Sequence, residues 1–136
     1  MARATAHRLS KPASDPSESS GVRSCVSAAE WQTRVELAAC YRLVAQYGWD
    51  DLIFTHMSAR VPDAPEQYLL NPLGLLFEEV TASSLVKVAA DGSVLLDQTG
   101  LGINPGGFVI HGAVHDARPD ANCVIHLHTV PTVAGG

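Results

Sequence analysis

The segment 122–129 constrains the fold most, because it is predicted to be a buried strand and carries two histidines two residues apart. Side chains on a β-strand point alternately to the two faces of a sheet, so His126 and His128 are predicted to share one face. Ile125 and Leu127 then point the other way, into a core. Such a strand needs neighbouring strands and a covering layer. The segment therefore predicts a sheet protein with two histidines on one sheet face.

The rest of the chain contains patterns for two helices and several short strands. Ser27 is a predicted N-cap with Glu30 three residues later, and the helical spacing of apolar residues that follows ends at Gly48. A second helix is predicted over 106–117. Short β-like pieces are predicted at 52–54, 58–61, 68–70, 85–89 and 93–96.

The order of these elements, a helix, several antiparallel strands, a helix and a strand, predicts one layered αβ domain. The last two β-like pieces flank Asp91-Gly92, a strong signal for a hairpin. We expect the domain to occupy residues 27–136. Residues 1–26 are rich in Ser, Pro, Ala and Arg without periodicity, so we predict a disordered N-terminal tail there.

Composition excludes two classes of partner and suggests a compartment. The formal charge is -5, which gives no electrostatic footprint for nucleic acid. No apolar run approaches the roughly 20 residues that span a bilayer, so no membrane role is predicted. Cys25, Cys40 and Cys123 are odd in number and far apart, which is typical of reduced thiols in a cytoplasmic protein.

Four histidines lie in two spaced pairs. Neutral imidazole is a good ligand for zinc and similar divalent ions, so His126 and His128 are candidate metal ligands. The alternative is two partly exposed histidines on a strand without metal. His111 and His115 are four residues apart, which places them on one helix face, opposite an apolar face. Their face either looks toward the metal or is half-exposed and carries two ordinary histidines.

Four stretches carry a resemblance to a known family. They are Thr55-His56-Met57-Ser58-Ala59-Arg60, Asn71-Pro72-Leu73-Gly74, Asn104-Pro105-Gly106-Gly107-Phe108-Val109-Ile110-His111, and Ala117-Arg118-Pro119-Asp120-Ala121-Asn122-Cys123-Val124-Ile125-His126-Leu127-His128-Thr129. In this order they resemble the class II aldolase/adducin family, and the last is highly specific. The resemblance extends from Glu36 to the end of the chain.

The resemblance implies a layered αβα fold, with a central, mostly antiparallel sheet flanked by helices, and it also implies a metal and a reaction. Aldolases of the family form tetramers and hold Zn²⁺ with three histidines, two of which match His126 and His128. The metal acts as a Lewis acid that polarises the substrate carbonyl and stabilises the enediolate left by retro-aldol cleavage. The upstream turns bind a phosphate. The matching anion-binding positions here are His56, Leu73, Gly74, Gly106 and Gly107.

Three departures from the family pattern bear on activity. The catalytic acid of the aldolases falls at Phe108, which cannot transfer a proton. The side chains that contact phosphate are replaced, although glycine amides at a helix N-terminus can still bind an anion. The third metal histidine is expected beyond Gly136, so the domain is expected to be incomplete at its C-terminal end. His111 or His115 is a possible replacement ligand.

Two functions follow from these features, with a third, simpler alternative. The first is a metal-dependent lyase acting on a small hydroxy-carbonyl substrate as a homo-oligomer. The second is a non-catalytic, adducin-like association domain, which Phe108 favours. The third is a truncated product with little independent function.

Overall fold

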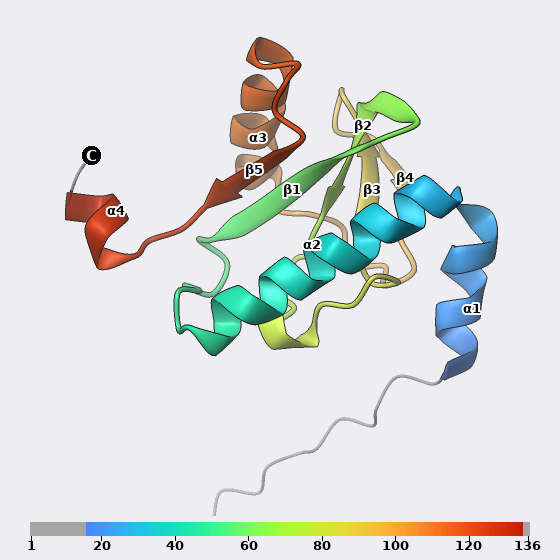
Figure 1. Cartoon of the computed structure of the whole chain (residues 1–136), viewed down its shortest axis with the longest axis horizontal. Coiled ribbons are helices and arrows are strands. Elements are labelled where there is room, and N and C mark those ends of the chain that lie inside the picture. The colour runs from blue at the N-terminus through green and yellow to red at the C-terminus, as the bar shows by residue number, and fades with distance from the viewer. Residues whose placement is uncertain (1–15, 135–136) are drawn as a thin grey trace, which may run out of the picture.

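The computed structural model describes residues 16–134, which form five helical segments and five strands (Figure 1). The helical segments are α1 (Pro16–Cys25), α2 (Ala28–Gln46), the 3₁₀ turn η1 (Phe77–Glu79), α3 (Pro105–Ala117) and α4 (Val130–Ala134). The strands are β1 (His56–Val61), β2 (Ala64–Leu70), β3 (Val86–Ala89), β4 (Val94–Leu96) and β5 (Cys123–His126).

The strands form a single sheet in the order β4-β3-β2-β1-β5, and all of its pairs are antiparallel. The first four strands are joined in sequence as a meander, and β5 returns after α3 to pair with β1. This pairing sets His56 opposite His126 and Ser58 opposite Val124. The predicted antiparallel sheet is confirmed, as is the hairpin around Asp91-Gly92.

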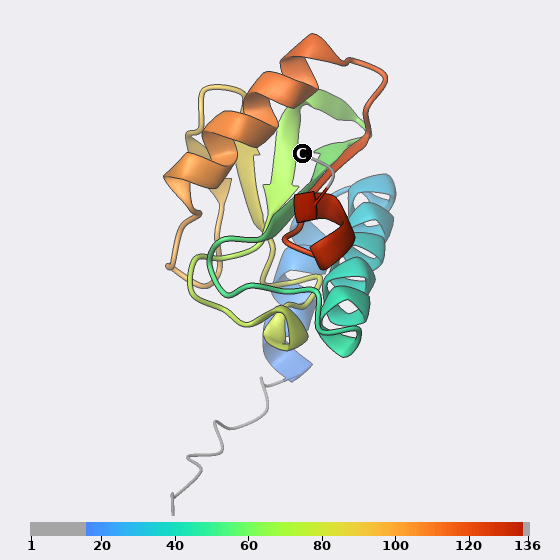
Figure 2. The same ribbon diagram turned by 90° about the vertical axis from the view of Figure 1, so that its left-hand side faces the viewer.

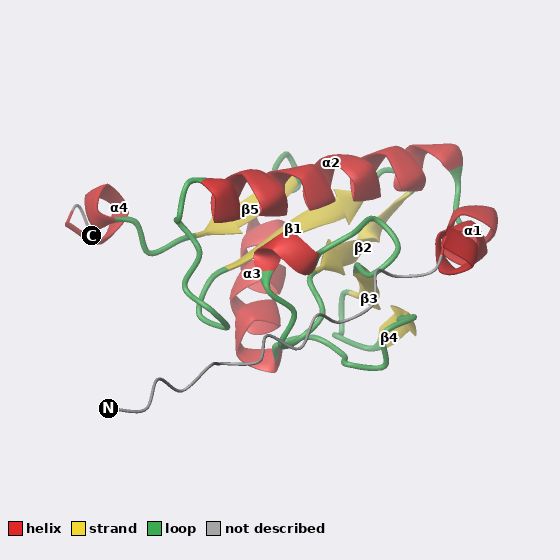
Figure 3. Ribbon diagram, turned by 90° about the horizontal axis from the view of Figure 1, so that it is seen from below, coloured by secondary structure: helices red, strands yellow, loops and turns green. Residues whose placement is uncertain are grey.

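Helices cover the two faces of this sheet, as the view from below shows (Figure 3). Helix α2 lies along one face and α3 along the other, which confirms the predicted αβα layering. Because β1 alternates, Met57 and Ala59 enter the apolar core under α2 with Leu37 and Tyr41. His56 and Ser58 point to the opposite face, toward α3.

Helix α2 is fixed at both ends by local hydrogen bonds. The Ser27 side chain accepts from the Glu30 N–H at 3.0 Å, which is the predicted N-cap. The Glu30 carboxylate is used elsewhere, because it pairs with Arg34 and Lys87, each at 2.9 Å. At the other end Gly48 adopts a left-handed φ of 64°, which terminates the helix as predicted.

The structure differs from the predicted secondary structure at residues 16–25 and at residues 52–54. Residues 16–25, predicted as part of a disordered tail, form α1, in which Val22 is buried; residues 1–15 lie outside the described part of the chain. The apolar residues 52–54, predicted as β-like, form an exposed turn that includes Leu52 at a φ of 48°. Turn geometry there overrides the β-propensity of the side chains.

The last turn of the molecule, α4, stands apart from the sheet and its covering helices (Figures 1 and 2). In the part of the chain described, no helix is long and apolar enough to cross a membrane. The three cysteines are free thiols, and Cys25 and Cys123 are exposed.

Candidate functional site

The five histidines within residues 16–134 form a connected cluster that extends from the space between the sheet and α3 to the end of β5. His56 comes from β1, His111 and His115 come from α3, and His126 ends β5 with His128 just after it. The His56 ring lies 4.6 Å from the His111 ring and 4.8 Å from the His126 ring, measured between centroids. The structure therefore brings together the two histidine pairs that the sequence singled out, and adds His56 between them.

A continuous set of hydrogen bonds joins the buried members of this cluster, and its direction follows from one carbonyl. The Ala121 carbonyl can only accept, so His115 Nδ1 carries the proton and donates to it at 3.1 Å. His115 Nε2 is then a lone pair, and the Ser58 hydroxyl donates to it at 2.9 Å. Ser58 has a single hydroxyl hydrogen, so its oxygen accepts from His111 Nδ1 at 2.5 Å.

The same reasoning assigns the protonated nitrogen in the His111 and His56 rings. His111 Nε2 is left as a lone pair, and it accepts from His56 Nδ1 at 2.8 Å. The unprotonated nitrogen at the end of the set is therefore His56 Nε2, which lies 3.4 Å from His126 Nδ1. We call His56, Ser58, His111 and His115 the histidine relay.

Burial keeps the relay neutral. The pKa of His111 is lowered to about 3. Burial is the largest cause of this shift, and the nearby His56 and His115 add to it. Burial also lowers the pKa of His56, with His126 and His128 adding to the effect. The pKa of His115 is lowered by burial as well, although its hydrogen bond to the Ala121 carbonyl opposes the shift.

The polar face of α3 is the buried one, which excludes the half-exposed alternative for His111 and His115. Each of these rings is 1% exposed, whereas Val109 is 69% and Ile110 is 54% exposed. The burial is possible because β1 supplies partners for both rings, and Tyr68 stacks on His115 at 4.5 Å. Both ring nitrogens of His111 and His115 are engaged, so neither presents a free nitrogen to a metal.

His128 does not lie on the strand, and the prediction of a strand through Thr129 is wrong. Strand β5 pairs only with β1, and His126 lies opposite His56, the first residue of β1, so nothing remains to pair beyond it. The two rings are nevertheless neighbours, with centroids 4.9 Å apart and nearly perpendicular planes. His128 Nδ1 lies 2.9 Å from an Asp51 carboxylate oxygen.

The predicted metal site can be compared with this arrangement. Within residues 16–134, no three His, Cys, Asp or Glu side chains surround a point that a metal ion could occupy. The donor chemistry fits a divalent ion, since imidazole nitrogens and one carboxylate lie together. The types of donor atom therefore suit a divalent ion. The His126 and His128 rings are adjacent, and His128 is held by Asp51.

The predicted anion-binding glycines lie at the N-terminus of α3 and in a separate turn. The Gly106 and Gly107 amides both donate to the Asn104 side-chain oxygen, at 3.1 and 3.4 Å. A Cβ on Gly107 would stand 2.8 Å from the His56 ring, so this glycine makes room for that ring. Gly74 has a φ of 84° in the turn after β2, with open space around it. An anion at α3 would have to displace the Asn104 cap.

Phe108 occupies the position at which the resemblance implies an acid. Its ring packs against the apolar cluster formed by Tyr68, Leu70, Val86 and Val88. The ring is also so close to Gly92 that an added Cβ there would lie 2.9 Å from it. Phe108 is therefore a packing residue that closes the sheet-facing side of α3.

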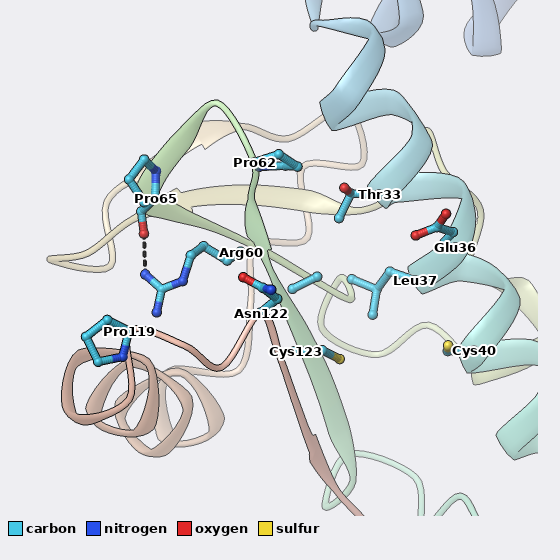
Figure 4. A pocket seen from close by; sticks show the side chains of 11 residues that line it. Thr33, Glu36, Leu37, Cys40, Arg60, Pro62, Pro65, Pro119, Asn122 and Cys123 are labelled. Atoms are coloured by element: carbon cyan, nitrogen blue, oxygen red, sulfur yellow. Dashed lines mark hydrogen bonds between the residues drawn. The ribbon is translucent and has the colours of Figure 1, made fainter.

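The structure also contains a cavity of about 650 Å³ on the α2 side of the sheet, away from the histidines (Figure 4). Helix α2, β1, the start of β2 and the segment that leads into β5 line it; the residues are Thr33, Glu36, Leu37, Cys40, Ala59, Arg60, Pro62, Pro65, Pro119, Asn122 and Cys123. It holds few convergent polar groups and none of the relay, so we place the candidate site at the histidines.

Sequence reasoning missed Ser58 and Asp51. Ser58 lies two residues after His56 on β1, so the alternation that pairs His126 with His128 could have placed it beside His56. Asp51 lies in a loop and reaches His128 across 77 positions of the sequence. No local pattern marks such a contact.

Comparison with known proteins gives consistent matches. Residues 35–135 match the Class II Aldolase and Adducin N-terminal domain. A Pseudomonas aeruginosa protein named after the class 2 aldolases is 62% identical over 113 residues, which are 83% of this chain and 43% of that protein. Mouse α-adducin is 50% identical over 97 residues, 71% of this chain and 13% of adducin.

A solved structure matches the fold. The L-fuculose 1-phosphate aldolase from Glaciozyma antarctica superposes with a TM-score of 0.70 at 29% identity, covering 88% of this chain and 46% of that one. The chain spans less than half the length of each of these three proteins.

Proposed function

The chain belongs to the class II aldolase and adducin family, and on that premise we propose that it binds a divalent metal ion through His126 and His128. We propose further that it is a lyase-type enzyme for a small hydroxy-carbonyl substrate. The observation that carries the proposal is the pair of adjacent rings, 4.9 Å apart and beside the Asp51 carboxylate. His126 is only partly buried and His128 is exposed, so both are accessible.

Zn²⁺ is the ion that we propose, because imidazole nitrogens are among its preferred ligands. Bound there, such an ion supplies Lewis acidity toward a substrate carbonyl oxygen. The chain itself orients the ligands. A carboxylate can only accept, so His128 Nδ1 donates to Asp51 and Nε2 is the nitrogen left for a ligand bond.

The surroundings also favour a class of substrate. The amides of Gly106 and Gly107 are already capped by Asn104, which speaks against an open phosphate site at α3. A hydroxy-carbonyl compound without phosphate therefore suits this site better than a sugar phosphate.

A second candidate is a non-catalytic, adducin-like association domain. It is favoured by Phe108, whose apolar packing leaves no proton-transferring group at the position of the family's acid. The 50% identity to mouse α-adducin is consistent with it. This candidate keeps the fold and the metal and lacks turnover.

Both candidate functions are compatible with a homo-oligomer, in which identical chains associate. Leu52, Ile53 and Phe54 are exposed, as are Val109 and Ile110 on the outer face of α3. The Asn104 side chain donates to the Ile53 carbonyl at 3.1 Å, which holds the loop against the start of α3. We call these five residues the apolar surface, and we propose that a second copy of the chain covers it. A cytoplasmic location stays a prediction.

The metal is tested by measuring the zinc, manganese and iron content of the purified chain and of a His126→Ala/His128→Ala double variant. A His7→Ala variant serves as control, because it also removes a histidine. We expect one divalent ion per chain in the wild type and the control, and none in the double variant. A metal-free wild type that also takes up no added Zn²⁺ would refute the metal proposal.

Turnover separates the two candidates. The wild-type chain loaded with Zn²⁺ is assayed for retro-aldol cleavage of hydroxy-carbonyl compounds, with L-fuculose 1-phosphate as the phosphorylated reference. Cleavage that stops on adding a chelator supports the lyase. Metal binding without cleavage of any compound supports the association domain.

A further inference from the structure

The residue that joins the relay to the proposed metal ligands is His56. We propose that His56 is a third ligand of the ion held by His126 and His128, and that it binds through Nε2. Ser58 and His111 then act as positioning residues for it. The inference rests on the proposed metal site and assigns to His56 a role different from the anion binding that the resemblance implies.

The direction of the hydrogen bonds in the relay supports this role for His56. Because the relay runs from the Ala121 carbonyl through His115, Ser58 and His111, each ring donates from Nδ1. His56 thereby points an unprotonated Nε2 away from the relay. A metal-binding histidine commonly donates its other ring N–H to a hydrogen-bond acceptor in this way.

The distance between the His56 and His126 rings also supports ligation by His56. His56 Nε2 and His126 Nδ1 are 3.4 Å apart, which is long for a hydrogen bond between ring nitrogens. Two nitrogens bound to one tetrahedral zinc at about 2.0–2.1 Å are separated by about 3.3–3.4 Å. The spacing of this pair is therefore the spacing of two ligands.

The His56 ring is held in a fixed position by its neighbours, as a metal ligand must be. An added Cβ on Gly107 would lie 2.8 Å from the ring, so the α3 backbone sits directly against it. His56 is 6% exposed, and its ring is fixed by this contact and by His111. His128 is the ligand that has to turn toward the ion, since its ring is exposed and contacts only the Asp51 carboxylate and the neighbouring His126 ring among the contacts that the structure gives.

Ligation is tested directly by nuclear magnetic resonance on the folded chain. The protein is labelled with ¹⁵N-histidine and loaded with ¹¹³Cd²⁺, and couplings between cadmium and ring nitrogens are recorded. We expect couplings to His56 Nε2, His126 and His128. Couplings to His126 and His128 alone would overturn the role of His56 and leave the proposed metal site intact. Absence of any coupling or uptake would overturn both.

Positioning is tested with Ser58→Ala, with Ser93→Ala as a control because Ser93 lies in an exposed hairpin turn. In the metal-free wild type, ¹⁵N shifts should show His56, His111 and His115 with Nε2 unprotonated. Ser58→Ala should mix the tautomers of His56 and His111 and weaken Zn²⁺ binding about 10–100-fold, as outer-shell changes do. His56→Gln should weaken it more. Unchanged tautomers and affinity in Ser58→Ala would overturn the positioning role.

Discussion

At the scale of single residues, Gly107 determines whether His56 can occupy its place. The His56 ring lies where a Gly107 side chain would be, whereas Gly106 faces only the Asn104 oxygen at 3.5 Å. Two adjacent glycines thus have different reasons to be there. Sequence alone placed both in one predicted anion site, because it does not show what stands opposite each glycine.

We therefore expect Gly107→Ala and Gly106→Ala to differ in stability. Overpacking costs about 1–3 kcal/mol, so Gly107→Ala should lower the free energy of unfolding by that amount and displace the His56 ring. Gly106→Ala meets only an ordinary contact, and should be neutral or stabilise the helix by up to about 1 kcal/mol. Urea unfolding measures both, and equal effects of the two changes would contradict this explanation.

The lowered pKa values of the relay predict how stability depends on pH. In the unfolded chain these histidines take up protons near pH 6.5, whereas the folded state keeps His111 neutral down to about pH 3. The unfolded state therefore binds more protons in this window, and stability is present above pH 6.5 and is lost as the pH falls toward 3.

The slope of this loss approaches about 1.4 kcal/mol per pH unit for each buried histidine. Thermal melts of the metal-free chain between pH 7.5 and pH 4.5 measure it. His111→Gln should flatten the dependence, and His7→Ala should not. A melting temperature that stays constant or rises as the pH falls would contradict the prediction.

At the scale of elements, Arg34 ties α2 to the start of β3. Its side chain is fully buried and donates to Glu30, to the Ala82 carbonyl and to the Leu85 carbonyl. The pKa of Arg34 is lowered by burial, with Glu30 opposing the shift. A charge at this depth is tolerated only because these partners surround it.

Removing this side chain should cost far more than removing an exposed one from the same helix. Arg34→Ala leaves the Glu30 carboxylate without its buried partner, and we expect a loss of about 3–5 kcal/mol in the free energy of unfolding. Gln32→Ala removes only an exposed hydrogen bond to Glu36, and should change stability by less than about 0.5 kcal/mol. Urea unfolding of the two variants measures both losses in the free energy of unfolding. Equal losses would contradict the stabilising role of the buried Arg34 contacts.

The elements were predictable where local chemistry fixes them. Ser27 and Gly48 set the ends of α2, and Asp91-Gly92 sets the hairpin between β3 and β4. The buried face of α3 was not predictable, because it depends on Ser58 and His56 arriving from β1 to satisfy His111 and His115. Polar partners from a distant strand reversed the orientation that hydropathy favours.

At the scale of the whole molecule, the layers and the strand order bring together residues from separate elements. A layered αβ domain followed from the order of helices and strands, and the resemblance implied the αβα arrangement, which is the fold of the family. The candidate site could not be predicted from the order of elements. His56 and His126 are 70 positions apart in the sequence and meet only through the pairing of β1 with β5. Asp51 needed the loop geometry as well.

Association is the property that belongs to the molecule as a whole. The apolar surface leaves Val109 69% and Phe54 58% exposed, beside the candidate site. Contiguous apolar side chains of this kind mark interaction surfaces on soluble proteins. Asp51, which contacts His128, directly precedes Leu52, so a second copy bound over this loop would lie beside the candidate site.

We expect Val109→Lys to reduce the mass of the oligomer, because a charge on a covered apolar surface is costly to bury. Val94→Lys is the matched control, since Val94 is also half-exposed, at 50%, but lies on β4 away from the apolar surface. Neither change should alter the stability of the single chain by more than about 0.5 kcal/mol. Sedimentation velocity gives the mass of each, and circular dichroism confirms folding. A wild type that sediments as a monomer, or a Val109→Lys oligomer of unchanged mass, would show that this surface does not carry the association.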